Sequence, residues 1–579
     1  MKRKGDLRRV LADLSHGGHA VVDSAPEAKD AVRAGATPLS EVIQTPEVAV
    51  ASSAEALQIV GTTSFDYLFP ELLDPAVFAD THLPAGTPAE IDTSVEALND
   101  LGAAMVEQNP AAPQQNSPIP PILTYWGQFV DHDLTANTDR DNVISIEGEP
   151  LPPLPPDDVR NDLKNLRDPA LNLDSVYGDG PFTPAPAGSD EFVPYDGIKL
   201  RLGTLTPVNA GVRIPPVDDM ARDLPRIFDP ADVDRHAKAQ IGDGRNDENL
   251  VVAQLHVAFL RFHNAAVDWV RANEPERTGD GEIFSRARDL TRWTYQWLTV
   301  HDFLATVTTP GTVDRVLTAD DDLLDLDTRG TYMPLEFSVA AYRFGHTMIR
   351  GAYDWNRNFG LPGNNLQSDA TFVQLFQFTG KARPTFAFGL PTLPTNWPVE
   401  WSRFVDPDSI IANRFARRID TQLAPPLADL LNEGNDPTLS TRVQELLKHL
   451  ARRNLLRGFR LSLPTGQAVA EQLGVDPLTQ AELETNSSQA VKDALTKGGF
   501  FTRTPLWFYV LKESEVRSQG NTLGEVGSEV VASTIIGQIK HDPRSYLQQS
   551  GWTPSAGVRL PNGSPVRSIA DFLRFAGVL

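Results

Sequence analysis

The chain has 579 residues, of which 41% are hydrophobic and 8% aromatic, so it can bury a large core and has neither a disordered nor a fibrous composition. Its 76 acidic and 52 basic residues give a formal net charge of −24, which disfavours nucleic acid and anionic membranes as partners and mildly favours a neutral or cationic substrate. There is no cysteine, so disulfides, zinc-thiolate sites, iron–sulfur clusters and thiol catalysis are excluded, and any metal must use His, carboxylate or carbonyl ligands.

Residues 1–61 differ in composition from the rest of the chain. They are rich in Ala, Val, Pro and Ser, and we expect a loosely attached N-terminal arm that precedes one globular domain, residues 62–579. The N-terminus starts with basic residues but lacks the apolar stretch of a secretory signal, and no segment approaches the roughly 18 apolar residues of a membrane-spanning helix. We therefore expect no membrane span, and a location that is cytoplasmic or reached by a non-classical export route. The oligomeric state is open.

The domain is predicted to be mainly α, a single large helical domain with long loops and very little sheet. Its 46 Pro and 41 Gly residues break it into many helices. There is no fixed-period repeat, phosphate-binding loop, HExxH motif or dinucleotide fingerprint. Apolar residues recur near the helical period in the stretches 249–273, 284–308, 334–352, 442–458 and 526–540.

The stretch WGQFVDHDL, residues 126–134, sets four polar side chains in what otherwise reads as a buried helix. An α-helix turns by about 100° per residue, so Gln128, Asp131 and His132 share one face. Asp133 points about 100° away from His132. Burying such a set costs free energy unless a polar or charged group fills the space before it, so the pattern predicts two separate sites on two faces.

Two of the 11 histidines have sequence neighbours that indicate a functional role. His132 has a carboxylate on each side, and His346 follows Gly345, which has no side chain and lets a flat group approach the backbone. Taken alone, each is equally compatible with a core histidine. His256 and His263 are seven apart on one apolar stretch, and we expect core or edge histidines with satisfied hydrogen bonds.

Four motifs in one order resemble a known family. They are WGQFVDHD, GRNDENL, AAYRFGHTMIR and RRNLLRGFRLSLPTG, and together they resemble the animal-type haem peroxidases of the peroxidase-cyclooxygenase superfamily, in its bacterial branch. The resemblance covers roughly residues 62–579 and implies a single helical haem-peroxidase domain. It assigns His132, Arg245 and Gln128 as distal catalytic residues, His346 as proximal iron ligand, Asn454 as acceptor of its Nδ1 proton, Arg343 and Arg457 near the haem propionates, and Asp131 and Glu248 as carboxylates that form ester bonds to haem b.

These residue types suit the cleavage of peroxide. Haem iron needs a neutral proximal imidazole whose other ring nitrogen is hydrogen bonded. On the open side an imidazole can take a proton from peroxide and return it to the leaving oxygen, and a guanidinium stabilises the charge that develops there. Simpler assignments stay open: Asp131 and Glu248 as ionised partners of Arg245, Arg343 and Arg457 as surface salt bridges, and Asn454 as a helix cap.

The resemblance also implies one calcium ion, held by Asp133 and the loop RDPALNLDSVYGDGP. The alternating positions in this loop, in extended chain, turn successive oxygens to one side, and calcium takes about six to eight hard oxygen ligands. Relatives more often have Thr at position 168 and Asp at position 172. The alternative is an Asx-rich turn without an ion. The candidate ligands in the loop are Asp168, the carbonyl of Ala170, Asn172 and Asp174.

The function implied is a haem peroxidase that reduces hydrogen peroxide and oxidises a small aromatic or (pseudo)halide donor. Relatives that oxygenate fatty acids have a radical tyrosine three residues before the proximal histidine; here that position is Arg343, and Tyr342 is expected to face elsewhere. Asn249 stands where some members have a methionine bonded to haem, which disfavours chloride as donor. The alternatives are a haem-dependent fatty-acid dioxygenase, or a non-catalytic adhesion or matrix protein on the same fold.

Overall fold

The structure is a computed structural model, and it describes only part of the chain. It gives the backbone of residues 8–13, 19–24 and 48–51 within the first 61 residues. From there on it describes residues 63–109, 115–136, 146, 151–183, 192–208, 220–232, 235–319, 322–360, 369–380, 392–430, 433–435 and 437–579.

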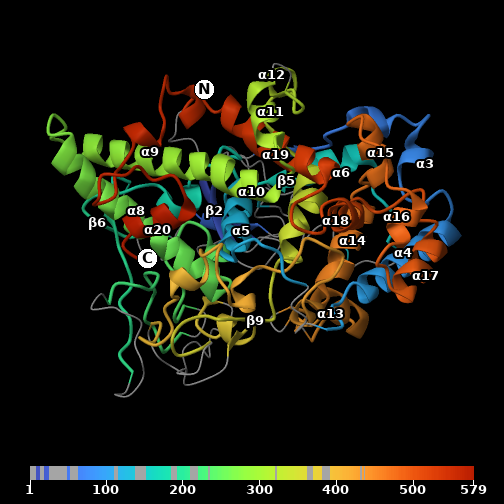
Figure 1. Cartoon of the computed structure of the whole chain (residues 1–579), viewed down its shortest axis with the longest axis horizontal. Coiled ribbons are helices and arrows are strands. Elements are labelled where there is room, and N and C mark those ends of the chain that lie inside the picture. Colours follow the sequence, from blue (N-terminus) through green and yellow to red (C-terminus); the bar gives the residue numbers. More distant parts are fainter. Residues whose placement is uncertain are drawn as a thin grey trace.

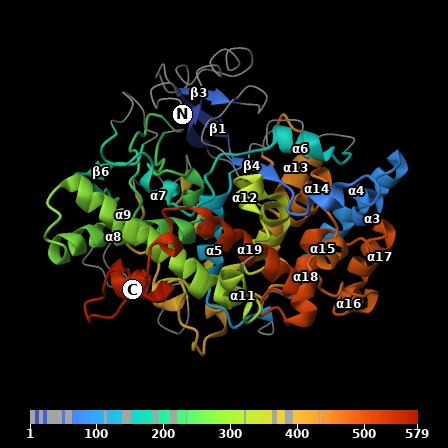
Figure 2. The same ribbon diagram turned by 90° about the horizontal axis from the view of Figure 1, so that it is seen from above.

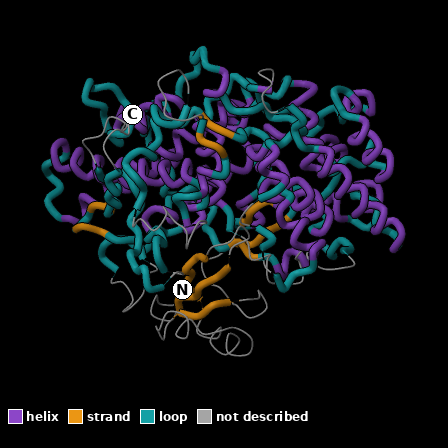
Figure 3. Tube along the Cα trace, turned by 90° about the horizontal axis from the view of Figure 1, so that it is seen from below, coloured by secondary structure: helices purple, strands orange, loops and turns teal. Residues whose placement is uncertain are grey.

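Helices dominate the described part of the domain (Figures 1 and 3), which confirms the predicted mainly α class. The long helices α8 and α9 lie side by side, and α5 lies near the centre of the molecule (Figure 1). The α-helices of six or more residues are α4 (Pro88–Ala104), α5 (Ile122–Leu134), α6 (Pro156–Asp162), α8 (Leu250–Asn273), α9 (Asp280–Leu298), α11 (Thr312–Thr318), α13 (Thr441–Lys448), α14 (Leu450–Arg460), α15 (Gly466–Gln472), α17 (Gln489–Gly498), α18 (Leu506–Arg517), α19 (Glu525–His541) and α20 (Ile569–Phe575).

Strands are short and few among the described residues. In the N-terminal 61 residues the strands pair in the order β2-β1-β3, and they lie on one side of the helices (Figure 2). In the domain, β4 pairs with both β5 and β8, which ties its first residues to the segment that leads to His346. The strands are β1 (Arg8–Asp13), β2 (His19–Ser24), β3 (Val48–Ala51), β4 (Thr63–Asp66), β5 (Lys164–Asn165), β6 (Tyr195–Asp196), β7 (Lys199–Leu200), β8 (Tyr332–Pro334), β9 (Ala352–Tyr353) and β10 (Ala370–Thr371).

The core is built on α5 and α8. Phe129 of α5 stacks on Phe259 of α8 with ring centroids 4.2 Å apart, and the indole of Trp126 donates to the Thr299 hydroxyl at 3.1 Å. Helix α8 begins where the side chain of Asn249 accepts from the amide of Val252. It is long and apolar enough to cross a bilayer, but 83% of its most apolar 18-residue window is buried inside the protein, as in the core helix of a globular domain.

Three predicted helices have a different form. Residues 334–352 do not make one α-helix: a π-helix, Glu336–Ala340 (η7), is followed by a 3₁₀ helix, Ala341–His346 (η8). Two backbone carbonyl oxygens in this segment accept hydrogen bonds from side chains. The Arg343 side chain donates to the oxygen of Ser338, and the indole of Trp507 donates to the oxygen of Arg343. These side-chain contacts take the place of backbone bonds that a regular helix makes.

The predicted helix 442–458 is divided into α13 and α14 at His449, whose φ of −100° and ψ of 99° are extended. At this point the carbonyl of Lys448 accepts from the amide of Leu430, which belongs to a distant segment. The predicted helix 284–308 forms α9 as far as Leu298 and continues as a π-helix, Thr299–Leu304 (η6). Helices α5, α8 and α19 form where their sequence patterns predict them.

Candidate active site

One cavity of about 430 Å³ is lined by His132 and His346 together. Its polar wall comes from α5, from the turn before α8 and from η8, and includes Gln128, Asp131 and Glu248. Its volume lies in the range of small-molecule and cofactor sites. Much of the remaining wall is apolar: Leu123, Phe303, Phe344, Phe372, Phe376 and Leu427.

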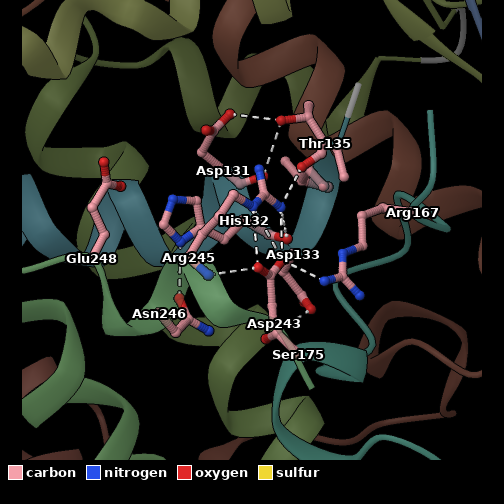
Figure 4. Close-up of polar contacts among 12 residues, drawn as sticks. Asp131, His132, Asp133, Thr135, Arg167, Ser175, Asp243, Arg245, Asn246 and Glu248 are labelled. Carbon is pink, nitrogen blue, oxygen red and sulfur yellow. Dashed lines mark hydrogen bonds and ion pairs between the residues drawn. The ribbon is translucent and has the colours of Figure 1, made fainter. Parts of the chain in front are cut away.

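His132 is almost fully buried, at 2% exposed, and its ring is held from behind (Figure 4). Its Nδ1 lies 2.9 Å from Oδ1 of Asn246, a residue in the 3₁₀ helix Gly244–Asp247 (η5). A carboxamide oxygen only accepts, so Nδ1 carries the proton and Nε2 is left unprotonated. Burial, and after it the positive charge of Arg245, lower the pKa of His132, so the neutral imidazole is favoured.

Arg245 lies behind His132, away from the residues that line the cavity (Figure 4). Its Nη2 donates to the backbone oxygens of His132 at 2.9 Å and Thr135 at 2.7 Å, and the guanidinium forms an ion pair with Asp243. The structure therefore corrects the expectation that this guanidinium faces the leaving oxygen directly, because the buried carboxylate turns it toward the end of α5. The ion-pair partner of Arg245 is therefore Asp243, and not Asp131 or Glu248 as the simpler assignment had it.

Asp243 joins two buried arginines. Its carboxylate also pairs with Arg167, the first residue of the candidate calcium loop. Although burial raises it, the pKa of Asp243 is held well below its ordinary value by the charges of Arg245 and Arg167. Asp243 and Asn246 were not predicted as site residues. Both lie within two residues of Arg245, and no local spacing in the sequence marks which residue each one contacts.

Gln128, Asp131 and Glu248 line the cavity together, as predicted for one face of α5 and the turn before α8. The amide of Gln128 donates to the Glu248 carboxylate at 3.3 Å and accepts from Asn249 at 3.0 Å. Asp131 accepts from the Thr135 hydroxyl at 2.9 Å. Each carboxylate thus accepts a hydrogen bond from a neutral donor, Asp131 from Thr135 and Glu248 from Gln128.

On the other side of the cavity, His346 ends η8. Burial, reinforced by the charges of Arg343 and Arg453, lowers the pKa of His346 to about 3, so the ring is neutral at neutral pH. Asn454 of α14 lies beside it, with Nδ2 3.1 Å from Nδ1 of His346. Its Oδ1 accepts from Nη1 of Arg343 at 3.3 Å.

This amide orientation corrects one expectation. The pair Asn454 and His346 forms, but the NH₂ group faces the ring because Arg343 holds the carbonyl oxygen, so Asn454 is a donor to Nδ1. An imidazole that binds metal through Nε2 must carry its proton on Nδ1. Half a turn of the carboxamide puts its oxygen opposite Nδ1 and meets this requirement.

Two further wall residues differ from the prediction. Arg453 lines the cavity beside Arg343, whereas Arg457, one turn later on α14, does not. Tyr342 also lines the cavity, with its hydroxyl donating to the Gly127 oxygen at 3.2 Å, although it was expected to face elsewhere. The reason is the 3₁₀ geometry: the cavity wraps around the end of η8, so consecutive residues up to His346 border it.

Asp133 points away from the cavity toward the loop that follows residue 167, as the helical spacing predicts. It accepts from the amide of Leu173 at 3.1 Å, and the Ser175 hydroxyl lies 3.5 Å from it. Burial, and then the charge of Asp174, raise the pKa of Asp133 to about 7. Leu173 and Leu171 have positive φ values of 62° and 50°, so the loop is not the extended chain that was expected.

The other candidate calcium ligands have partners of their own. Asp168 lies 3.7 Å from Arg544, the carbonyl of Ala170 accepts from Gln296, and Asn172 accepts from the amide of Asp174. Among the described residues, no group of three or more His, Cys, Asp or Glu is arranged to hold a metal ion. The structure brings Asp133 and Asp174 together and does not gather the full ligand set.

The two core histidines differ. His263 is satisfied, by Tyr177 at 3.1 Å and by the oxygen of Ile198 at 3.1 Å. His256 was expected to be satisfied as well, but neither of its ring nitrogens has a hydrogen-bond partner among the described residues. Its ring centroid lies 6.0 Å from that of Phe129.

Part of the chain is similar to known proteins. Residues 203–386, about a third of the chain, match the sequence profile of the animal haem peroxidase family. The matched segment contains Arg245, Glu248 and His346. A curated relative is the peroxidase-like protein of Margaritifera margaritifera, 29% identical over 289 residues, which are 44% of this chain and 35% of that protein. The match thus spans about a third of the relative's length.

Solved structures with a similar course of the chain include peroxidase A of Dictyostelium discoideum, with a TM-score of 0.48, 16% identity, and coverage of 84% of this chain and 88% of that chain. A fatty acid alpha-dioxygenase of Arabidopsis thaliana has a TM-score of 0.46 and 14% identity, with coverage of 83% of this chain and 71% of that chain.

Proposed function

We propose that this protein is a haem peroxidase that reduces hydrogen peroxide and oxidises a small aromatic or (pseudo)halide donor. The observation that supports it is the single cavity lined by His132 and His346, with Gln128, Asp131 and Glu248 on the same wall. The match of residues 203–386 to the animal haem peroxidase family supports the cofactor and the class of reaction.

The residues present fit a haem. The cavity has about 430 Å³ and a largely apolar wall, and a Cβ added at Gly345 would meet no atom within 4 Å, so there is open space against the backbone beside His346. His346 is neutral, as an iron ligand must be. Arg343 and Arg453, both on the wall, would hold the propionates.

Asp131 and Glu248 would form the ester links to haem b. Their carboxylates border the cavity and are held by the neutral donors Thr135 and Gln128, and Arg245 is turned away from them. An arginine partner would have kept them as ionised, unreactive pairs.

The bound haem would supply the oxidation of the donor, and the protein would supply proton transfer and orientation. Neutral His132, with its proton on Nδ1, would accept the proton of peroxide at Nε2 and return it to the departing oxygen. Gln128 would hold peroxide or water by neutral hydrogen bonds. Arg245 would act through the backbone of His132 and through its charge, which favours the neutral ring.

We also propose one calcium ion beside Asp133. A buried carboxylate near a second one, Asp174, is costly unless a cation joins them, and this supports the ion. Chelation should lower the melting temperature of the wild type, and Asp133→Asn should abolish that response. An equal loss in both proteins, or none in either, would contradict the ion at this site.

A fatty-acid dioxygenase is the second candidate, because Tyr342 lies on the cavity wall and offers an oxidisable phenol near His346. The non-catalytic alternative, an adhesion or matrix protein, has no feature of the cavity in its favour.

The test is a spectrum and an assay of the purified protein. A Soret band that stays with the protein after acid-acetone extraction is the expected result for ester-linked haem, and Asp131→Ala with Glu248→Ala should make it extractable. His132→Ala should keep the Soret band and lose about 10²- to 10⁴-fold in peroxide turnover with an aromatic donor. His346→Ala should lose the haem itself. A protein without a Soret band, or unchanged turnover in His132→Ala, would refute the proposal.

A further inference from the structure

The carboxamide of Asn246 is fully buried, with 0% exposed, directly behind the ring of His132 (Figure 4). Its Oδ1 lies 2.9 Å from Nδ1 of His132. The residue is fixed from its own backbone, whose amide donates to the oxygen of Asp243 at 3.0 Å within η5. The contact therefore joins two rigid elements, η5 and α5.

The other end of the same carboxamide has no partner in the part of the chain that the structure describes. Nδ2 of Asn246 is buried and makes no hydrogen bond to any described residue. Leaving such a group unpaired costs free energy, and an apolar side chain at this position would avoid that cost. An asparagine that only filled space would be the more costly choice, so the oxygen that faces His132 is the functional end.

We propose that Asn246 is a positioning residue for His132, and this rests on the proposed peroxidase function. By accepting the Nδ1 proton it holds one tautomer and one ring orientation, so that the unprotonated Nε2 is the nitrogen available to the cavity. The adjacent residue, Arg245, holds the backbone oxygen of His132 at 2.9 Å. Two consecutive residues of η5 thus hydrogen bond to His132, Arg245 at its backbone oxygen and Asn246 at its ring.

The arrangement has a consequence for proton transfer. A neutral imidazole has its proton on either nitrogen, and only the form with a free Nε2 can accept a proton from a ligand in the cavity. Without the carbonyl of Asn246, the two tautomers of His132 compete. The fraction of productive rings then falls, and with it the rate of the peroxide step, while donor binding is untouched.

The first experiment reads the tautomer directly. Ring nitrogens are observed by NMR in full-length protein labelled with ¹⁵N-histidine, as the diamagnetic ferrous carbon monoxide complex if haem is present and as purified if it is not. His132→Gln assigns the resonance. The expected result is a proton on Nδ1 in the wild type and a measurable fraction on Nε2 in Asn246→Leu. A proton on Nε2 in the wild type, or no change in Asn246→Leu, would overturn the proposal.

Asn165→Leu is the matched control. Asn165 is buried and holds the C-terminal end of the same helix, through the amide of Ala136 at 2.8 Å and the oxygen of Leu134 at 3.0 Å, without touching the ring. It should lower the melting temperature and leave the His132 tautomer unchanged. If it shifts the tautomer as much as Asn246→Leu does, the effect of Asn246 is merely structural and the proposal fails.

The second experiment measures the reaction with peroxide. Asn246→Leu should lower its rate constant about 10- to 100-fold with an unchanged KM for the donor, and Asn246→Asp, which keeps an acceptor oxygen, should recover most of the rate. Equal rates in the two variants would overturn the proposal. A wild type with the expected tautomer but no reaction with peroxide would refute the peroxidase function and leave the positioning contact standing.

Discussion

Asn454 faces His346 with its amide nitrogen 3.1 Å from Nδ1, while its carbonyl oxygen accepts from Arg343. The two bonds compete for one carboxamide, because an iron-bound imidazole needs an acceptor at Nδ1 and Arg343 needs an acceptor as well. Haem binding at His346 should therefore be coupled to a rotation of this amide.

The first prediction concerns that coupling. Asn454→Asp should lower the reduction potential of the haem, because a carboxylate pulls the Nδ1 proton more strongly and makes the imidazole a better donor to ferric iron. Asn454→Leu should raise it. Spectroelectrochemical titration measures both shifts, and a shift of the same sign in the two variants would show that Asn454 does not bond to the ligand.

Asp243→Asn should be strongly destabilising. It leaves the buried guanidinium groups of Arg245 and Arg167 with a neutral partner, and the expected loss in unfolding free energy is about 3–5 kcal/mol by urea denaturation. The matched control is Asp196→Asn, which breaks an exposed pair with Arg201 and should cost at most about 1 kcal/mol. Similar losses of unfolding free energy in the two variants would mean that the buried ion pairs of Asp243 contribute no more to stability than an exposed pair does.

His256 should make the protein sensitive to acid. Burial lowers its pKa from 6.5 to about 3, so the folded state keeps it neutral while the unfolded state takes up a proton below pH 6.5. The contribution to stability is therefore complete above pH 6.5 and is lost progressively as the pH falls toward 3. In His256→Leu, the melting temperature should fall less steeply over this range.

His263→Leu is the companion variant. It removes two hydrogen bonds and leaves the Tyr177 hydroxyl and the Ile198 oxygen buried, so it should cost roughly 1–3 kcal/mol even at neutral pH. If His256→Leu is as destabilising at neutral pH as His263→Leu, the ring of His256 has a partner in solution.

Tyr342→Phe separates the two candidate reactions. Its hydroxyl donates to the Gly127 oxygen, a backbone group, so peroxide turnover with an aromatic donor should change by no more than about twofold. Oxygen uptake with an unsaturated fatty acid is measured in parallel. Uptake by the wild type that disappears in Tyr342→Phe would favour the dioxygenase over the peroxidase.

The sequence by itself determined the helices with strong periodicity and the faces of α5. Gln128 and Asp131 share the cavity with His132, and Asp133 points elsewhere, because the rotation per residue of a helix is a local property. The motif around His346 likewise identified a residue on the same cavity wall. These inferences need only neighbours along the chain.

Only the tertiary structure decided which partners the polar groups take. Arg245 turns to Asp243, Asn246 meets His132 from a position 114 residues away, and the amide of Asn454 is held by Arg343. The same is true of the break at His449, where a distant amide takes a helix carbonyl. Such choices depend on which segments pack together in three dimensions, and a hydrogen-bonding group buried there bonds to whatever that packing brings within reach.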